Sequence, residues 1–145
     1  VAIARHIAPH DRRVVGRESL LGIRDRHDLL GHPKLGASFE GLVLEELLRV
    51  ASARDIHFYS TYSGAELDFV VQSSGRLVGF EAKRTEAPSL TKSMRVSLDD
   101  LRLKHLFVVY PGAERFPLRK DVTAIPITAL SAGLERLLRD VRGSS

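Results

Sequence analysis

Four charged side chains between residues 64 and 84 alternate with apolar ones, a pattern typical of two strands joined by a short turn. They are Glu66, Asp68, Glu81 and Lys83. Carboxylates are the ligands that Mg²⁺ prefers, and an ammonium group beside them can stabilise developing negative charge. Like charges directly opposite each other destabilise a sheet, and such local conflicts tend to mark sites. The segment therefore predicts a site where a divalent cation lies between carboxylates.

A two-residue turn at 74–75 would set the register of these strands. Asp68 then lies opposite Glu81, and Glu66 lies opposite Lys83. Because strand side chains alternate between faces, all four charges project from one face. The apolar residues expected on the other face are Leu67, Phe69, Val71, Val78, Phe80 and Ala82. The alternative is a longer turn with a shifted register, which leaves the charges solvated on an exposed face.

The helix expected at 39–52 carries a carboxylate on its apolar stripe. At about 100° per residue from Phe39, Glu40 falls at about 100°, inside an apolar arc of about 20° to 140°. That arc holds Val43, Leu44, Leu47 and Val50. A carboxylate there is costly unless it is paired, protonated or bound to a metal, so we expect Glu40 to approach the strand charges. The alternative is an acidic residue favoured by the helix macrodipole.

A helix Glu, a strand Asp and a Glu-x-Lys in the next strand together resemble the active-site pattern of the PD-(D/E)xK restriction-endonuclease-like superfamily. More narrowly, GASFEGLVLEELL, YSTYSGAELDFVV, GFEAKRT and HLFVVYPG resemble the domain of unknown function that commonly follows a AAA+-type ATPase core and a winged helix in bacteria and archaea. The similarity covers about residues 29 to 130. It implies an α/β fold with a restriction-endonuclease-like central mixed sheet flanked by helices.

The resemblance also implies roles for individual residues. The implied catalytic site comprises Glu40, Asp68, Glu81 and Lys83, with Glu66 as a neighbour. Asp68, Glu81 and Glu40 would hold Mg²⁺ or Mn²⁺, and Lys83 would place positive charge beside the attacking water. The backbone of DNA would contact basic residues on and before the following helix. These are Arg84, Lys92, Arg95 and Arg102.

A AAA+ ATPase core is the other partner that the resemblance implies. The 145 residues contain no GxxxxGK[ST] phosphate loop, so we expect no ATP binding. We also expect the chain to be a C-terminal piece of a AAA+ ATPase-associated protein. Many relatives with this fold have lost nuclease activity. The alternative function is therefore a catalytically inactive binding or regulatory module of such an ATPase.

Composition narrows the class of protein. The absence of cysteine excludes disulfides and thiolate metal sites, and no apolar run approaches the ~20 residues of a membrane span. We expect a soluble cytoplasmic protein with no membrane partner. The net charge of +4 favours a polyanionic partner only weakly. The expected organisation is an N-terminal remnant or linker at 1–28, an endonuclease-like domain at 29–141 and a disordered tail at 142–145.

Periodicity predicts the elements that must position the site. Besides the helix at 39–52, we expect strands at 56–61, 66–71, 76–83, 106–110 and 122–126, a helix between Pro88 and Lys104, a last helix at 128–141 and one or two short helices within 18–31. The six histidines show no close metal-binding spacing, and we expect them at the surface or in the core. His57 shares strand parity with Tyr59 and Thr61 and is the histidine placed to line the site.

Overall fold

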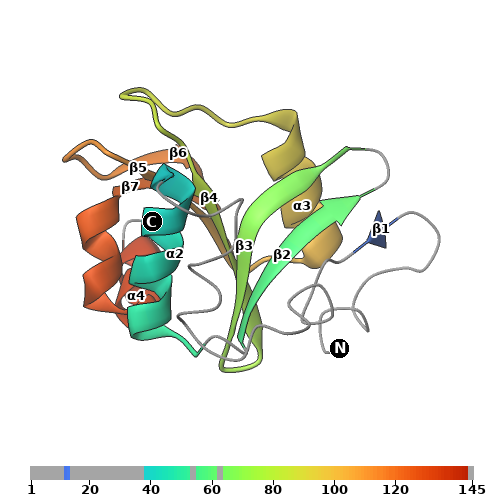
Figure 1. Cartoon of the computed structure of the whole chain (residues 1–145), viewed down its shortest axis with the longest axis horizontal. Coiled ribbons are helices and arrows are strands. Elements are labelled where there is room, and N and C mark those ends of the chain that lie inside the picture. The colour runs from blue at the N-terminus through green and yellow to red at the C-terminus, as the bar shows by residue number, and fades with distance from the viewer. Residues whose placement is uncertain (1–11, 14–37, 53–54, 62–63, 144–145) are drawn as a thin grey trace.

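A seven-stranded mixed sheet forms the centre of the molecule (Figure 1). The computed structural model describes residues 12–13, 38–52, 55–61 and 64–143. The strands, in sheet order, are β1 (Arg12–Arg13), β2 (Ile56–Thr61), β3 (Glu66–Ser73), β4 (Arg76–Ala82), β5 (His105–Tyr110), β7 (Val122–Pro126) and β6 (Phe116–Arg119). The first four strands pair antiparallel, β4, β5 and β7 run parallel, and β6 returns antiparallel to β7.

Helices cover both faces of this sheet. They are α2 (Phe39–Val50), α3 (Lys92–Leu101), the 3₁₀ helix η4 (Ile127–Ala132) and α4 (Leu134–Arg142). Figure 1 shows α2 and α4 on one face and α3 on the other, with α2 and α3 both beginning at the same end of the sheet. No helix in the described part of the chain is long and apolar enough to cross a membrane. The predicted α/β class, a mixed sheet flanked by helices, is confirmed.

Two apolar clusters hold these layers together. Beneath α2 and α4 the buried side chains include Leu44, Phe69, Phe80, Phe107 and Leu137. Beneath α3 they include Leu67, Val70, Met94, Leu106 and Val108. Burying each large apolar side chain contributes about 1.5 to 3 kcal/mol, so both helix layers are fixed firmly on the sheet.

Local signals explain where the two site-bearing helices begin. Ser38 caps α2 by accepting a hydrogen bond from the N–H of Gly41 at 3.0 Å, and Thr91 caps α3 by accepting one from the N–H of Met94 at 3.2 Å. Both hydroxyls satisfy amide groups that a helix leaves unpaired in its first turn. At the other end of α3, Arg102 adopts the left-handed conformation, with φ 49° and ψ 49°.

The structure corrects some predicted elements. The last helix is divided, because Gly133 at φ 87° separates η4 from α4. The strands β1 and β6 were not predicted. Strand β6 has only four residues and contains Pro117. Because proline is disfavoured inside strands, the sequence of this segment does not predict a strand. The helices expected within 18–31, and most of the segment 1–28, lie outside the described residues.

The turn that defines the β3–β4 hairpin is the one expected. Ser73 pairs with Arg76, and the two turn residues have positive φ angles, 50° at Ser74 and 74° at Gly75. Two successive left-handed residues make a type I′ turn, whose twist matches that of the adjoining strands. The predicted register is therefore confirmed from the turn as far as the ladder extends.

Candidate functional site

A β-bulge in β3 determines where Asp68 lies. Between two consecutive pairs of the β2–β3 ladder, β2 contributes one residue, Phe58, whereas β3 contributes two, Asp68 and Phe69. The extra residue shifts the alternation of side chains along the strand. Leu67 consequently packs in the cluster beneath α3, whereas Phe69 packs beneath α2 and α4. The expectation that Leu67 and Phe69 share one face is wrong for this reason.

The two strands of the hairpin separate beyond the bulge. The β3–β4 ladder ends one position before Asp68 and Glu81, so the expected backbone pairs do not form there. The N–H of Asp68 instead donates to Oε2 of Glu81 at 3.1 Å, and the N–H of Ala82 donates to Oδ2 of Asp68 at 2.8 Å. Two carboxylates thus replace the ladder. We call this opening, formed by Asp68, Glu81, Ala82 and Lys83, the fork.

Lys83 completes the fork. Its Nζ lies 2.9 Å from Oε1 of Glu81, and its backbone N–H donates to the carbonyl of Val109 in β5 at 2.9 Å. Burial disfavours the ammonium form, but the hydrogen bond to Glu81 and the charges of Glu81 and Asp68 outweigh this effect and raise the pKa of Lys83. The lysine therefore stays protonated beside the carboxylates.

The ionised form of Asp68 is disfavoured in the fork. Burial, the charge of Glu81 and the charge of Glu40 raise the pKa of Asp68 from 3.8 to about 7, against the opposing effects of the Ala82 hydrogen bond and of Lys83. Near neutral pH a proton or another cation is needed to hold the two carboxylates together. The like-charge conflict anticipated between Asp68 and Glu81 is present in the structure.

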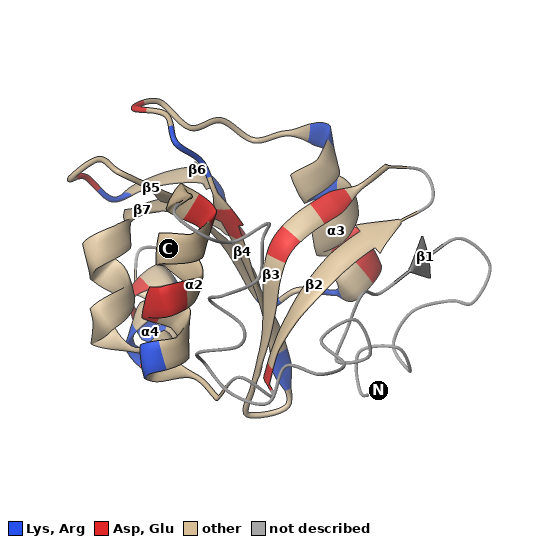
Figure 2. Cartoon of the chain, in the orientation of Figure 1, with Lys and Arg blue, Asp and Glu red and all other residues tan. Residues whose placement is uncertain are grey.

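Glu40 and Glu66 lie outside the fork formed by Asp68, Glu81, Ala82 and Lys83. Glu40 is half-buried in the first turn of α2, and its charge acts on Asp68. Figure 2 shows acidic positions in this turn, in β3 and in β4 at one end of the sheet. Across the residues that the structure describes, however, no three His, Asp or Glu side chains gather closely enough to hold a metal ion. Glu40 thus adds charge without forming a three-ligand centre.

Glu66 does not face Lys83. Its N–H donates to Oγ of Ser93 in α3 at 2.6 Å, the same hydroxyl donates to its carbonyl at 2.7 Å, and its side chain is exposed. Ser93 therefore satisfies the β3 backbone where β4 has moved away. Sequence reasoning missed this serine because its partner lies 27 residues away, and no local pattern distinguishes it from an ordinary serine on a helix.

Comparison with known proteins identifies the family. The domain of unknown function DUF4143 matches residues 35–130. The chain belongs to the DUF4143 family. It is 51% identical over 107 residues to an uncharacterized protein of Mycobacterium bovis and equally to one of Mycobacterium tuberculosis. The aligned region covers 74% of this chain, and the chain spans about a quarter, 24%, of the length of each relative. No solved structure matches the chain.

The DUF4143 match contains the whole fork, and its chemistry suits a hard divalent cation. Asp68 and Glu81 supply carboxylate oxygens, the ligand type that Mg²⁺ and Mn²⁺ prefer. Within the described part of the chain, no hydrogen bond or ion pair reaches Oδ1 of Asp68. A cation beside that oxygen would relieve the repulsion that raises the pKa of Asp68.

Three of the four basic residues expected to contact DNA lie around the fork of this DUF4143 domain, whereas the fourth, Arg102, lies at the far end of α3. Arg84 directly follows it, and Lys92 and Arg95 occupy the first turns of α3; all three are exposed. Figure 2 shows basic segments just after β4 and at the start of α3. His57 is buried opposite Val70, on the far side of the bulge from the fork.

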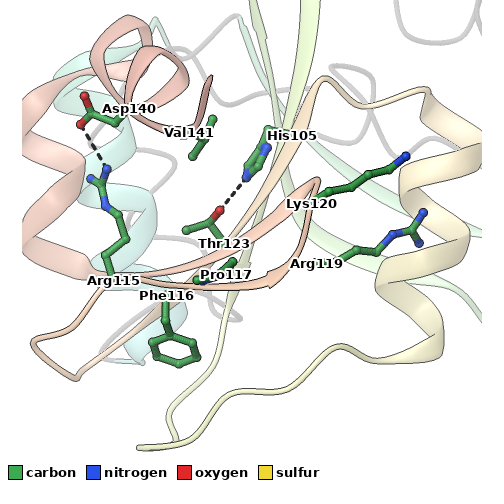
Figure 3. A pocket seen from close by; sticks show the side chains of 9 residues that line it. All are labelled: His105, Arg115, Phe116, Pro117, Arg119, Lys120, Thr123, Asp140 and Val141. Carbon is green, nitrogen blue, oxygen red and sulfur yellow. Dashed lines mark hydrogen bonds and ion pairs between the residues drawn. The ribbon is translucent and has the colours of Figure 1, made fainter. Parts of the chain in front are cut away.

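A separate pocket of about 360 Å³ lies at the other end of the sheet, between α4 and the β6–β7 hairpin (Figure 3). His105 at its base contacts Oγ1 of Thr123 through Nε2 at 2.8 Å. Arg115 forms an ion pair with Asp140 at 3.1 Å. In Figure 3 the Lys120 side chain extends away from His105. The cationic groups of this pocket therefore do not converge on a ligand position.

Proposed function

We propose that this DUF4143 domain is a Mg²⁺-dependent endonuclease-like domain of the PD-(D/E)xK type that hydrolyses phosphodiester bonds of DNA. The single observation that supports this proposal is the fork. A bulge and a broken ladder bring Asp68, Glu81 and Lys83 together, and the arrangement raises the pKa of Asp68 to about 7. Arranging two carboxylates in this way costs stability, and such costs tend to be found at functional sites.

Each side chain of the fork has a role in such a reaction. Asp68 and Glu81 would hold the cation, with Glu40 adding negative charge from α2 that favours cation binding. A bound divalent ion would activate water and neutralise the scissile phosphate. Lys83, fixed by Glu81 at 2.9 Å, keeps a positive charge beside the site where negative charge develops on the phosphoryl oxygens. Ser93 hydrogen-bonds both backbone groups of Glu66 where β3 has separated from β4.

The test compares Mn²⁺ binding and DNA cleavage in wild type, two fork variants and one control variant. Wild type should bind Mn²⁺, show a metal-dependent rise in Tm and cut single-stranded, duplex or branched DNA. Asp68→Asn should lose metal binding, whereas Lys83→Ala should lose far more cleavage than metal affinity because Lys83 acts mainly in the transition state. Asp99→Asn, which removes an exposed carboxylate from α3, is the matched control. Wild type that shows neither metal binding nor cleavage would rule out the nuclease.

A second function is favoured by a different observation. In the described structure, three of the four fork carboxylate oxygens already meet the N–H of Asp68, the N–H of Ala82 or Nζ of Lys83, and no three-ligand group exists. Such a fork can serve as a structural element in a catalytically inactive binding or regulatory module of a AAA+ ATPase. The domain would then associate with the purified ATPase core of a full-length relative, and Lys83→Ala would weaken that association without any metal dependence.

A further inference from the structure

A groove of about 560 Å³ lies at the end of the sheet opposite the fork. One wall is the β3–β4 turn with the beginning of β4, and the other is the connection from α3 to β5. The lining residues are Gln72, Gly75, Arg76, Leu77, Leu101, Arg102, Leu103 and Lys104. Three of these eight are cationic and none is acidic. Figure 2 shows basic segments at the beginning of β4 and directly after α3.

The cations of this groove differ from the two arginines of the pocket beside α4. Arg115 is neutralised by Asp140 at 3.1 Å and Arg119 by Asp121 at 3.0 Å. Arg76, Arg102 and Lys104 are exposed, and within the described part of the chain none of them forms an ion pair. Their charges therefore reinforce one another across a concave surface that excludes part of the solvent.

The backbone of Arg102 adds a second observation. This residue ends α3 in the left-handed conformation, with φ 49°, which glycine adopts far more easily. A cation near a helix C-terminus is favourable by itself, and that effect accounts for one positive charge. It does not account for Arg76 or Lys104, which lie on β4 and before β5. Arg76, Arg102 and Lys104 thus come from different parts of the chain but line the same groove.

The groove is aligned with the fork. Strand β4 begins in the groove at Arg76 and ends in the fork at Ala82, six residues later, so the two sites are about 20 Å apart. That separation equals about six base-pair steps of 3.4 Å. Between them, Lys92 and Arg95 are exposed on α3 together with one acidic residue, Asp99. The cations thus extend from the fork to the groove along the α3 layer.

We infer that the groove binds the phosphodiester backbone of nucleic acid and anchors it while the fork contacts the strand about 20 Å away. The choice of nucleic acid as ligand rests on the proposed function, whereas the groove itself rests on its own geometry and charge. Phosphate oxygens complement the three cations that line the groove, and a long anionic chain is the ligand that can contact both sites at once. The contacts would be to phosphates, so they would set affinity and position without reading sequence.

The experiment measures binding of fluorescein-labelled 20-base single strands and 20-base-pair duplexes by anisotropy, at several salt concentrations and with EDTA present. The groove variant is R76Q/R102Q/K104Q. The matched control, R136Q/R139Q/R142Q, removes the same charge from exposed positions on α4. We expect the groove variant to lose at least tenfold in DNA affinity and the control to lose less than twofold. The slope of log K against log salt for duplex should fall by about 0.9 for each phosphate contact removed.

A single substitution keeps the inference testable should the triple variant fail to fold. Arg102→Gly places the preferred residue at φ 49°, so Tm should rise while DNA affinity falls. Equal losses of DNA affinity in both triple variants, or binding of poly-glutamate as tight as that of DNA, would overturn the inference. Because EDTA removes metal from the fork, these results are independent of catalysis. DNA binding without any cleavage in Mn²⁺ would retain the groove and refute the nuclease.

Discussion

Replacing Asp68 with asparagine tests the electrostatic conflict in the fork directly. In the folded protein the pKa of Asp68 is raised to about 7 from its usual 3.8. The folded state therefore holds a proton that the unfolded chain releases between these values. As pH rises from 4 to 7 the wild-type protein loses stability, because the unfolded chain gains free energy by ionising this carboxyl whereas the folded state, with Glu81 beside it, does not. Asparagine has the shape of the protonated acid and does not titrate.

The size of the effect follows from the two pKa values. At about 1.4 kcal/mol for each pH unit, their separation corresponds to about 4 kcal/mol in all, of which about 3 kcal/mol falls between pH 5 and pH 8. Asp68→Asn should be about 1 to 2 kcal/mol more stable than wild type at pH 5 and about 4 kcal/mol more stable at pH 8. The carbonyl of asparagine can still accept the hydrogen bond from Ala82.

The assay is urea unfolding of both proteins at pH 5, 6, 7 and 8 with EDTA present. Titrating groups away from the fork contribute equally to both proteins, so the difference in free energy of unfolding reports on Asp68 and the charges coupled to it. Asp99→Asn, at an exposed position in α3, is the control variant. A difference between Asp68→Asn and wild type that stays constant from pH 5 to pH 8, or that favours wild type at pH 8, would refute the reasoning.

Three further predictions concern the scaffold. Gly79→Ala should destabilise the domain by about 1 to 3 kcal/mol in urea unfolding, because a Cβ there would lie within 2.9 Å of three leucine side chains; Gly143→Ala, with its nearest neighbour at 3.9 Å, should change little. Ser93→Ala should cost about 1 to 3 kcal/mol by unpairing both backbone groups of Glu66, and unchanged stability would contradict this. Burial lowers the pKa of His105 to about 4, so as pH falls the unfolded state takes up the His105 proton before the folded state does. In the Asp68→Asn background, the free energy of unfolding should therefore drop by at most about 3 kcal/mol between pH 6.5 and pH 4. His105→Gln should abolish that drop.

The hairpin shows how far the sequence could predict this site. The Ser-Gly turn fixed the register, because two left-handed positions in succession permit only one tight geometry. The conflict between Asp68 and Glu81 was visible as two carboxylates at matching distances from that turn. Alternation of apolar and charged residues predicted the strands themselves, and their bounds agree with the structure to within two residues.

The bulge could not be predicted in the same way. It depends on how β3 pairs with β2, and the sequence ELDFVV alternates equally well with or without an extra residue. The position of Glu66 was consequently wrong, since its backbone partner is Ser93 on a different element. Strand β6 escaped detection because four residues containing a proline have almost no periodicity. Tertiary pairing, rather than local propensity, decided each of these features.

The fork also depends on the one extra residue that the bulge inserts into β3. One β2 residue faces two in β3, so deleting Asp68 would allow an uninterrupted ladder on that side. Such a deletion removes one codon and leaves the helices and both apolar clusters largely as they are. Loss of the site therefore requires no gradual remodelling of the domain. Family members with and without the extra residue could share one architecture and differ completely in whether they have a reactive centre.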